Sequence, residues 1–570
     1  MNKDRRSVMM SLGMLSLAAA PAAAQTSTAA TDPRDVFDNR QAVAAATVDP
    51  QLQHISTRSH SEPGDGGGAE WRRVNAEPPH PGKLKDAAGA WFELASFVIT
   101  PEMFGAKGGD VDDRAALQDA VDYVTAAHRE LRFLQPRYSI RGHLVVGANR
   151  FRFSFTGSAY TDLVQLQDNT SHFYFAYENT SYWSISNFRF LWTNDQPPTN
   201  TEAYAIRFNV ERRGPSGHWN FLISDCLFWN GFRGAGISER TTDDLPCAIW
   251  GGSFVRLRGN ERMTGALLYI RAYGKAGLPN NRVEHLYARC DRMVEPALVF
   301  ENCDTLTMSN IEFNAGTGCR ISVRSSLTVL IDGVRCEHVG LTKDDDAYFT
   351  FIGQRLRATL RGITVQTVFL NVPNRAAIVK AVSGAQVAVD EVVFDFNRRN
   401  VLRYTSAVGG MLDVVLLDKN SRATVGRLAP FRDPAVRLAG PDSVDRLFFA
   451  NAWPLSLTVP DGSSAGNSGT ALCTVPGAVG SVVVSLPGDG DGAAWRLVIE
   501  RRSSTGGSAT LAAIDVPKGR LAMVAAPGAG MPADGDFTVM PGDLLSARVE
   551  PASAASPASP VRVVINVIQN

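Results

Sequence analysis

Residues Thr100 to Val124 read TPEMFGAKGGDVDDRAALQDAVDYV, a glycine-rich turn with two adjacent acids that runs into an amphipathic helix. Apolar residues recur in the second half at helical spacing, at positions 116, 117, 120, 121 and 124, and give the helix one apolar face. Asp112 or Asp113 is placed to cap the helix, because a short carboxylate accepts the free N–H groups of the first turn. The stretch therefore predicts a capped helix that covers an apolar surface.

Short β-rich segments recur from about residue 151 onward, each with a polar residue or glycine at its centre. They are ISNFRF at Ile185, ISDCLF at Ile223, VEHLYA at Val283, MSNIEF at Met308, IDGVRC at Ile331, LRGITV at Leu360 and VDEVVF at Val389. Their central residues, at 187, 225, 284, 310, 333, 362 and 391, are 38, 59, 26, 23, 29 and 29 residues apart, and the interval of 59 is expected to contain two repeats. A spacing of 23–29 residues is typical of one coil of a solenoid, and the central Asn, Asp or Gly marks a bend in the coil.

The entry segment and these repeats together resemble the pectate-lyase-like superfamily, which contains single-stranded right-handed parallel β-helix proteins and tailspike-like polysaccharide-degrading proteins. In that superfamily the entry helix covers the open N-terminal end of the solenoid. The resemblance implies an all-β fold with a right-handed parallel β-helix over residues 98–450 and an N-terminal capping helix. An immunoglobulin-like sandwich is the alternative for short strands at even spacing, and the entry helix, the spacing and the length of the array favour the β-helix.

The remaining segments predict the domain organisation. Residues 1–24 read as a signal peptide, with Arg5 and Arg6 before an apolar run and a small-residue cleavage site, and the paired arginines suggest the twin-arginine route. Residues 25–97 read as a linker and leader segment, with Trp71, Trp91 and Phe92 as packing anchors. Residues 451–570 contain short strands divided by Gly, Pro and Asp turns, which predict a β-sandwich-like domain.

Bulk composition excludes several classes of function. The 570 residues carry a formal net charge of zero, so nothing electrostatic favours a nucleic-acid partner. No stretch after the signal peptide approaches 18 uninterrupted apolar residues, so no membrane span is expected after cleavage. The seven cysteines show no metal-binding spacing. If export follows the twin-arginine route, buried free thiols are expected rather than disulfides.

Missing motifs narrow the chemistry that the resemblance implies. The Gly-His-Gly and Arg-x-Lys motifs of polygalacturonase-type hydrolases and the Asp-Pro-His element of mannuronan epimerases do not occur. Asp243-Asp244 is interpreted as a turn. Calcium would need carboxylates that converge from adjacent coils, whereas Asp344-Asp345-Asp346 is one contiguous loop. No cofactor is therefore predicted, and calcium remains an alternative without a clear motif.

Candidate site residues follow from the register of the coils. The second position after each central residue is expected to face outward, which selects Arg189, Leu227, Leu286, Glu312, Arg335, Thr364 and Val393. The fourth and fifth positions select Trp192, Trp229, Asn230, Arg289, Asn314, Glu337 and His338. These residues predict a band of Trp, Arg, Glu and His across the middle coils.

The band offers two kinds of catalysis. Glu312 and Glu337, one coil apart, are candidates for an acid/base or retaining glycosidase pair. For β-elimination from a uronic acid, Arg289 or Arg335 would neutralise the sugar carboxylate, and His338 or His285 would be the base. Trp192, Trp229, Asn230 and Asn314 are the candidate substrate-binding residues. For each residue the structural alternative stands beside the functional one: core packing for Trp, surface ion pairs for Glu and Arg.

The resemblance and the export signal together favour a periplasmic or secreted enzyme that cleaves an extracellular or capsular polysaccharide, by β-elimination or by glycoside hydrolysis. The alternative is a non-catalytic polysaccharide-binding or structural envelope protein. The C-terminal domain has three alternative roles: it covers the last coil, binds carbohydrate, or drives the formation of a homotrimer.

Overall fold

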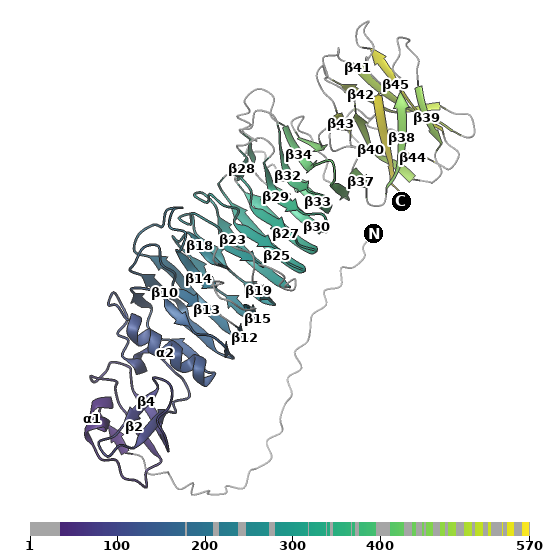
Figure 1. The fold of residues 1–570 in the computed structure, drawn as a ribbon. Helices are drawn as coiled ribbons and strands as arrows, with labels where there is room; N and C mark the ends of the chain where they lie inside the picture. Colours follow the sequence, from purple (N-terminus) through teal and green to yellow (C-terminus); the bar gives the residue numbers. More distant parts are fainter. Residues whose placement is uncertain are drawn as a thin grey trace, which may run out of the picture.

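The computed structural model describes most of the chain from residue 35 onward (Figure 1). The described residues are 35–176, 179–208, 216–237, 247–272, 280–316, 318–337, 339–341, 346–365, 368–370, 375–394, 411–426, 436–439, 447–449, 452–459, 468–472, 477–485, 495–503, 508–516, 522–525, 538–539, 544–551 and 561–568. The predicted signal peptide, His338, Asp243 and Asp244 lie outside them.

A small module precedes the β-helix in the segment expected to be a linker and leader. Five strands pair in the order β1-β2-β3-β5-β4, and a short helix, α1, accompanies them. Their bounds are β1 Asp35–Phe37, α1 Arg40–Ala45, β2 His54–Thr57, β3 Ala69–Val74, β4 Lys83–Lys85 and β5 Trp91–Leu94. Trp71 and Phe92 are buried, as expected of packing anchors, whereas Trp91 is half-buried beneath the ammonium groups of Lys83 and Lys85.

The entry segment forms the 3-10 helix η1 (Pro101–Phe104) and the helix α2 (Arg114–Ala127), which lies at the N-terminal end of the solenoid (Figure 1). The predicted apolar face is confirmed, since Leu117, Val121 and Val124 are fully buried. Asp113 stands at the N-cap, but its carboxylate accepts hydrogen bonds from the N–H groups of residues 107 and 108 and so holds the glycine-rich turn. Asp112 accepts the N–H of the first helical residue, Arg114, at 3.1 Å.

The predicted parallel β-helix is confirmed by two sheets that run along the array. The first, called here the long sheet, contains β6 Glu130–Phe133, β7 Arg137–Ile140, β10 Ser154–Gln165, β13 Ser184–Trp192, β16 Leu222–Ser224, β17 Leu227–Phe228, β20 Gly252–Val255, β21 Arg258–Gly259, β23 Asn281–Arg289, β25 Thr305–Asn314, β27 Thr328–Glu337, β30 Arg357–Val365, β33 Gln386–Phe394, β35 Arg422–Val425 and β37 Leu447–Phe449. Each coil adds one rung, and successive rungs pair in parallel.

The second sheet covers the other side of the core and contains β8 Leu144–Val146, β11 Phe173–Phe175, β14 Tyr204–Phe208, β18 Arg233–Ile237, β22 Leu268–Arg271, β24 Leu298–Glu301, β26 Ile321–Arg324, β29 Ala347–Ile352, β32 Arg375–Val382, β34 Met411–Leu417 and β36 Val436–Ala439. The first coils add a third sheet of β9 Arg150–Phe151, β12 Thr180–Ser181, β15 Ser216–Trp219 and β19 Cys247–Trp250. A further pair, β28 Val339–Leu341 and β31 Val368–Leu370, follows the later coils.

A left-handed residue divides each rung of the long sheet into two halves, from the coil of β13 to the coil of β33. These residues are Asn187, Asp225, Arg256, His285, Asn310, Gly333, Gly362 and Glu391, each with a φ between 51° and 73°. Six of the seven predicted bends are confirmed, and the predicted bend at Glu284 is wrong by one residue. The extra bend at Arg256 confirms that the interval of 59 residues contains two coils.

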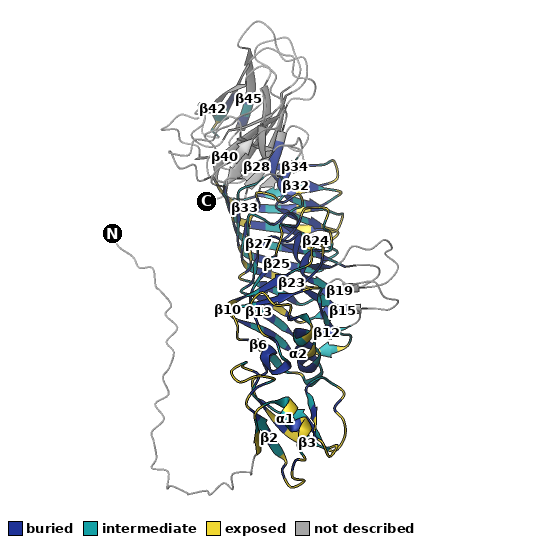
Figure 2. Cartoon of the chain, turned by 90° about the vertical axis from the view of Figure 1, so that its left-hand side faces the viewer, coloured by how far each residue is buried: buried dark blue, intermediate teal, exposed yellow. Residues whose placement is uncertain are grey.

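The interior of the coils is apolar and aromatic, and dark blue in Figure 2. Trp183 stacks on Phe221 with ring centroids 4.3 Å apart, and similar ring contacts link successive coils. The five cysteines whose side chains the structure describes are free thiols, the state predicted for export by the twin-arginine route: Cys226, Cys290, Cys303, Cys319 and Cys336. Burial raises the pKa of the Cys226 thiol to about 12, which keeps it protonated and inert.

The C-terminal domain is built from two antiparallel sheets that contact each other, as the sandwich prediction requires. One sheet contains β38 Ala452–Val459, β46 Val561–Ile568, β40 Gly477–Ser485, β43 Ala522–Ala525 and β44 Thr538–Val539. The other contains β39 Ser468–Leu472, β45 Leu544–Pro551, β41 Trp495–Arg502 and β42 Ser508–Val516. Among the described residues, no helix has the length and apolarity needed to cross a membrane.

Two histidines buried in the first coils predict a loss of stability in acid. Burial lowers the pKa of His172 to about 4 and that of His218 to about 3, whereas an unfolded histidine titrates near 6.5. Below pH 6.5 these two histidines therefore bind protons in the unfolded chain but not in the folded chain, so the free energy of unfolding falls as the pH falls. Each histidine should contribute a loss of about 2 kcal/mol between pH 7 and pH 5.

Urea denaturation of His172→Gln at pH 7 and pH 5 tests this loss. Glutamine can still donate to the carbonyl of Leu191, which the His172 ring contacts at 3.0 Å, but it does not titrate. The decrease in unfolding free energy should therefore be about 2 kcal/mol smaller in this variant than in the wild type. His285→Asn, at an exposed bend, is the control that should keep the wild-type decrease. An identical pH dependence in His172→Gln would contradict the prediction.

Candidate functional site

The bends determine which side chains reach the outer face of the long sheet. The second residue after each bend faces outward, and these residues pair side by side along the sheet. They form the first row: Arg189, Leu227, Arg258, Tyr287, Glu312, Arg335, Thr364 and Val393. The fourth residues after the bends form the second row, in which Arg289, Asn314 and Glu337 are neighbours on successive coils.

Two members of the first row were not predicted. Leu286 was expected to face outward but is 2% exposed, because the bend lies at His285 and moves the outward position to Tyr287. Arg258 was missed because its coil has an arginine, Arg256, at the bend instead of Asn, Asp or Gly. Both could have been found from the alternation of inward and outward residues along a strand. The outward residue of the first row lies two positions before the outward residue of the second row in the same coil.

Glu312 lies in the middle of the first row, between Tyr287 and Arg335 on the neighbouring rungs. It is half-buried, and its carboxylate has no hydrogen-bond or ion-pair partner among the residues that the structure describes. Partial burial and then the negative charge of Glu312 raise the pKa of the Tyr287 phenol above its ordinary value. Tyr287 therefore stays protonated at neutral pH and presents a hydrogen-bond donor beside an available carboxylate.

Glu337 has a different environment. Its carboxylate accepts hydrogen bonds from the guanidinium of Arg335 and, at 2.9 Å, from the amide nitrogen of Asn314. It pairs across the strands with Asn314, so Glu312 lies diagonally from it, one rung and two residues away. Strand spacings of about 4.8 Å across the sheet and about 3.3 Å per residue along it give a backbone separation of roughly 8 Å. The two carboxyl groups lie ~6.5–9.5 Å apart in inverting glycosidases and ~5–5.5 Å apart in retaining ones, and a backbone separation of this size allows the wider, inverting arrangement.

The predicted neutralising arginines are already paired. Arg289 contacts Glu261 at 2.5 Å and Asp291 at 3.0 Å, and Arg335 donates to Glu337. The exposed Arg258 has no ion-pair partner within the described part of the chain. Arg258 is therefore the cation of the first row that is available to an anionic ligand.

Two predicted sugar-binding residues are structural. Trp192 and Asn230 are each 2% exposed, so neither can stack on or bind a polymer, and the prediction for both is wrong. They occupy the fifth position after a bend, which alternation turns inward, whereas Trp229 occupies the fourth. Trp229 is half-buried, and the Arg189 guanidinium lies 5.6 Å from its ring centroid. It is the remaining aromatic candidate of the predicted band.

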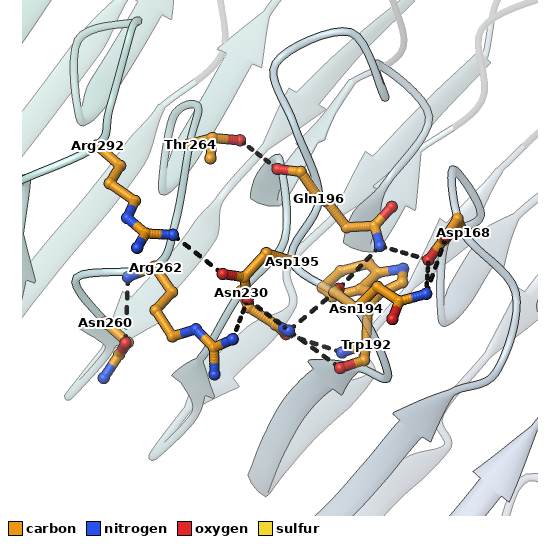
Figure 3. A network of polar contacts seen from close by, with 10 residues as sticks. All are labelled: Asp168, Trp192, Asn194, Asp195, Gln196, Asn230, Asn260, Arg262, Thr264 and Arg292. Atoms are coloured by element: carbon orange, nitrogen blue, oxygen red, sulfur yellow. Dashed lines mark hydrogen bonds and ion pairs between the residues drawn. The ribbon is translucent and has the colours of Figure 1, made fainter.

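Figure 3 shows what the buried pair does instead. The amide of Asn230 accepts the backbone N–H of Trp192 and donates to its carbonyl, at 2.8 and 3.0 Å. Asp195, three residues on, forms ion pairs with Arg262 at 2.5 Å and Arg292 at 3.0 Å. Partial burial opposes its ionisation, but hydrogen bonds from Arg262 and Asn230 outweigh burial and hold the pKa of Asp195 below its ordinary value.

This network fixes the loops beside the second row. Thr264 donates to the carbonyl of the fully buried Gln196 at 2.7 Å, which ties the loop after β13 to the loop after β21. The residues that precede Arg262 and Arg292, Glu261 and Asp291, both pair with Arg289 of the second row. These loops form the rim of the outer face, and ion pairs between neighbouring coils hold the rim together. No group of three or more His, Cys, Asp or Glu suited to a metal occurs among the described residues.

Comparison with known proteins gives a structural match only. No protein-family model matches this sequence, and no curated protein sequence matches it significantly. The enzymatically active domain of tailspike protein 4 from bacteriophage CBA120 aligns with a TM-score of 0.51 and 10% identity, over 93% of this chain and 77% of that one.

Two further solved structures align less well. The gp42 tailspike of Acinetobacter phage vb_AbaP_AS12 gives a TM-score of 0.41 at 11% identity, over 89% of this chain and 95% of that one. WceF of Pantoea stewartii, described as a glycan biofilm modifying enzyme with a tailspike-like fold, gives 0.34 at 11% identity, over 94% and 71%. The strands and the first alignment together show that this chain has the parallel β-helix fold of the phage tailspike proteins.

Proposed function

We propose that this protein cleaves an extracellular or capsular polysaccharide by glycoside hydrolysis on the outer face of the long sheet. The observation that carries the proposal is the arrangement of Glu312 and Glu337, two carboxylates on adjacent coils in different environments. An extended polymer can lie along such a row, because every coil presents one side chain at a regular spacing. The tailspike neighbours agree with a polysaccharide ligand, at the level of fold.

The two carboxylates divide the chemistry. Glu337, which receives hydrogen bonds from Arg335 and Asn314, is suited to be the general base that takes a proton from water. Glu312, free of such partners among the described residues, is suited to be the acid. The water oxygen attacks the anomeric carbon while Glu312 gives its proton to the glycosidic oxygen and the bond to that oxygen breaks. Solvent then restores both protonation states.

Incubation of the purified protein with a panel of acidic and neutral polysaccharides tests the proposal. We expect new reducing ends without the absorbance of an unsaturated uronate. Reducing ends that appear with that absorbance would mean β-elimination, and the assignment of Glu337 as the base that activates water would be wrong.

Arg258 predicts a preference for anionic polymers. Arg258→Ala should raise the KM for an acidic polysaccharide about tenfold at low ionic strength, and the effect should fade in ~1 M salt because exposed charges are then screened. The KM for a neutral polymer should not change. Arg282→Ala is the matched control, since Arg282 is also exposed but already pairs with Glu284. An equal effect of both substitutions would remove the specific role of Arg258.

A second candidate function is non-catalytic binding of a polysaccharide at the envelope. It is favoured by the many charges of this face that are satisfied within the chain, such as Arg289 with Glu261 and Asp291. Tight binding of a polymer by folded protein, with no cleavage of any member of the panel, would favour this function over hydrolysis.

We also propose that the protein is exported to the periplasm or secreted, on the strength of the apolar segment after Arg5 and Arg6. The mass of the protein recovered from the producing cells should match a chain that begins near residue 25. A mass that includes the first 24 residues would contradict export by a cleaved signal.

A further inference from the structure

One corner of the first coils repeats a left-handed turn. The residue that follows each strand of the third sheet has a positive φ: Arg152 at 55°, Tyr182 at 55°, Asn220 at 50° and Gly251 at 60°. In each case its N–H donates to a backbone carbonyl of the next coil, the carbonyl of residue 181, 219, 250 or 280. The turn is therefore the same structural element in four coils.

The residues at this turn differ in how well they suit it. Asn220 and Gly251 are the types that tolerate a left-handed backbone, whereas Arg152 and Tyr182 are not. An aromatic or long side chain is disfavoured at such a φ, and the corner would close equally well with Asn or Gly, as it does one coil further on. Local folding therefore gives no reason for Tyr182, and strained residues of this kind are often retained for binding.

The surface beside these two residues is hollowed. A depression of about 380 Å³ lies between the end of α2 and the first two coils, and His128, Arg152 and Tyr182 contribute to its lining. Tyr182 is 61% exposed, which leaves a face of its ring open to solvent. Ser154 and Ser184, the first residues of β10 and β13, line it with outward hydroxyl groups. Arg152 is exposed and has no ion-pair partner among the described residues.

We propose that this depression is a second carbohydrate-binding site, separate from the two rows, which holds one pyranose unit of an acidic polysaccharide. The sugar ring stacks on Tyr182, Arg152 meets its carboxylate, and Ser154 and Ser184 bind its hydroxyl groups. An amphipathic aromatic surface with a free guanidinium and hydroxyl groups matches the apolar face, the charge and the polar edge of such a sugar. The inference rests on the proposed polysaccharide substrate.

The site lies within reach of the rows. Ser184 belongs to β13 of the long sheet, and β25, which carries Glu312, follows it after four strand spacings. At about 4.8 Å for each spacing, the two sites are separated by roughly 19 Å along the axis of the solenoid. A polymer of several sugar units can occupy both sites, so the second site raises the affinity for long chains without touching the bond that is cleaved.

Tyr182→Asn is the decisive variant, because it gives this coil the residue that Asn220 supplies in the next one. The full chain carrying Glu312→Gln, so that no polymer is cut, is run in native gels that contain polygalacturonate, alginate or dextran. We expect Tyr182→Asn to weaken retardation by at least one acidic polymer roughly tenfold in apparent Kd and to leave dextran gels unaffected. Its melting temperature should stay at or above that of the parent, since Asn tolerates the turn.

Tyr160→Asn is the matched control. Tyr160 is also exposed (46%) with a left-handed φ of 65°, but it does not line the depression. Retardation that is weakened by Tyr182→Asn and not by Tyr160→Asn supports the site. Equal retardation of parent and Tyr182→Asn, equal weakening by both substitutions, or no retardation of the parent by either acidic polymer overturns it. Because the gels measure binding alone, absence of cleavage by the wild type would count against the proposed hydrolysis and not against this site.

Discussion

Replacing Glu312 by Gln should lower kcat/KM for polysaccharide cleavage by roughly 10²–10⁴-fold, the usual contribution of a positioned general acid. The amide cannot give a proton to the departing glycosidic oxygen, although it fills the same space. The loss should fall on kcat more than on KM, because the proton is transferred only in the transition state. Initial rates of reducing-end formation, measured on the polymer that the wild type cleaves best, give both constants.

The fold should survive this change. Glu312 is half-buried and has no hydrogen-bond or ion-pair partner among the described residues, so its replacement leaves no other described group without a partner. Glu284→Gln is the matched control: Glu284 lies on a neighbouring strand of the same sheet and pairs with the exposed Arg282. Wild-type activity in Glu312→Gln would show that the acid lies elsewhere. A large loss in Glu284→Gln as well would show that any disturbance of the sheet inactivates the protein.

The sequence predicted those parts of the site that local chemistry encodes. A left-handed bend is predicted by residue type alone at five positions, which are Asn187, Asp225, Asn310, Gly333 and Gly362. The outward-facing position lies two residues after each bend. At Arg256 the bend has none of these residue types, so neither this coil's bend nor the outward position of Arg258 was predicted. The error at Glu284 was a single residue, yet it exchanged the buried Leu286 for Tyr287, because alternation turns a slip of one into the opposite face.

Other parts of the site depend on contacts that no local pattern records. Asp195 and Arg292 are 97 residues apart in the chain, and they meet only because the chain makes three turns of the solenoid between them. Trp192 and Trp229 are both tryptophans, but Trp192 is buried and Trp229 is only half-buried. The difference arises because Trp192 is the fifth residue after a bend, which faces inward, and Trp229 is the fourth, which faces outward. The sequence therefore predicts the bend and the outward positions within a single coil. The contacts between side chains of different coils are seen only in the structure.

The largest expected effect on stability concerns an ion pair beneath the rim, between β18 and the loop that joins β23 to β24. Arg233 is 2% exposed, and its Nε lies 2.9 Å from a carboxylate oxygen of Glu295, with a second contact between the same two groups. The ring of Tyr269 lies 3.7 Å from the guanidinium carbon. Glu295→Ala should lower the free energy of unfolding by about 3–5 kcal/mol, because it removes the counter-charge that Glu295 provides to a buried guanidinium.

Urea denaturation followed by tryptophan fluorescence measures this loss, and two companion variants locate its cause. Glu284→Ala breaks an exposed pair with Arg282 and should cost about 0–1 kcal/mol. The double variant Arg233→Met/Glu295→Leu should recover most of the loss, because apolar side chains of similar volume avoid the desolvation of both charges. If Glu295→Ala costs no more than Glu284→Ala, the Arg233 charge has another counter-charge in the chain. If the double variant is as unstable as the single one, the pair contributes through shape and hydrogen bonding to Tyr204 rather than through charge balance.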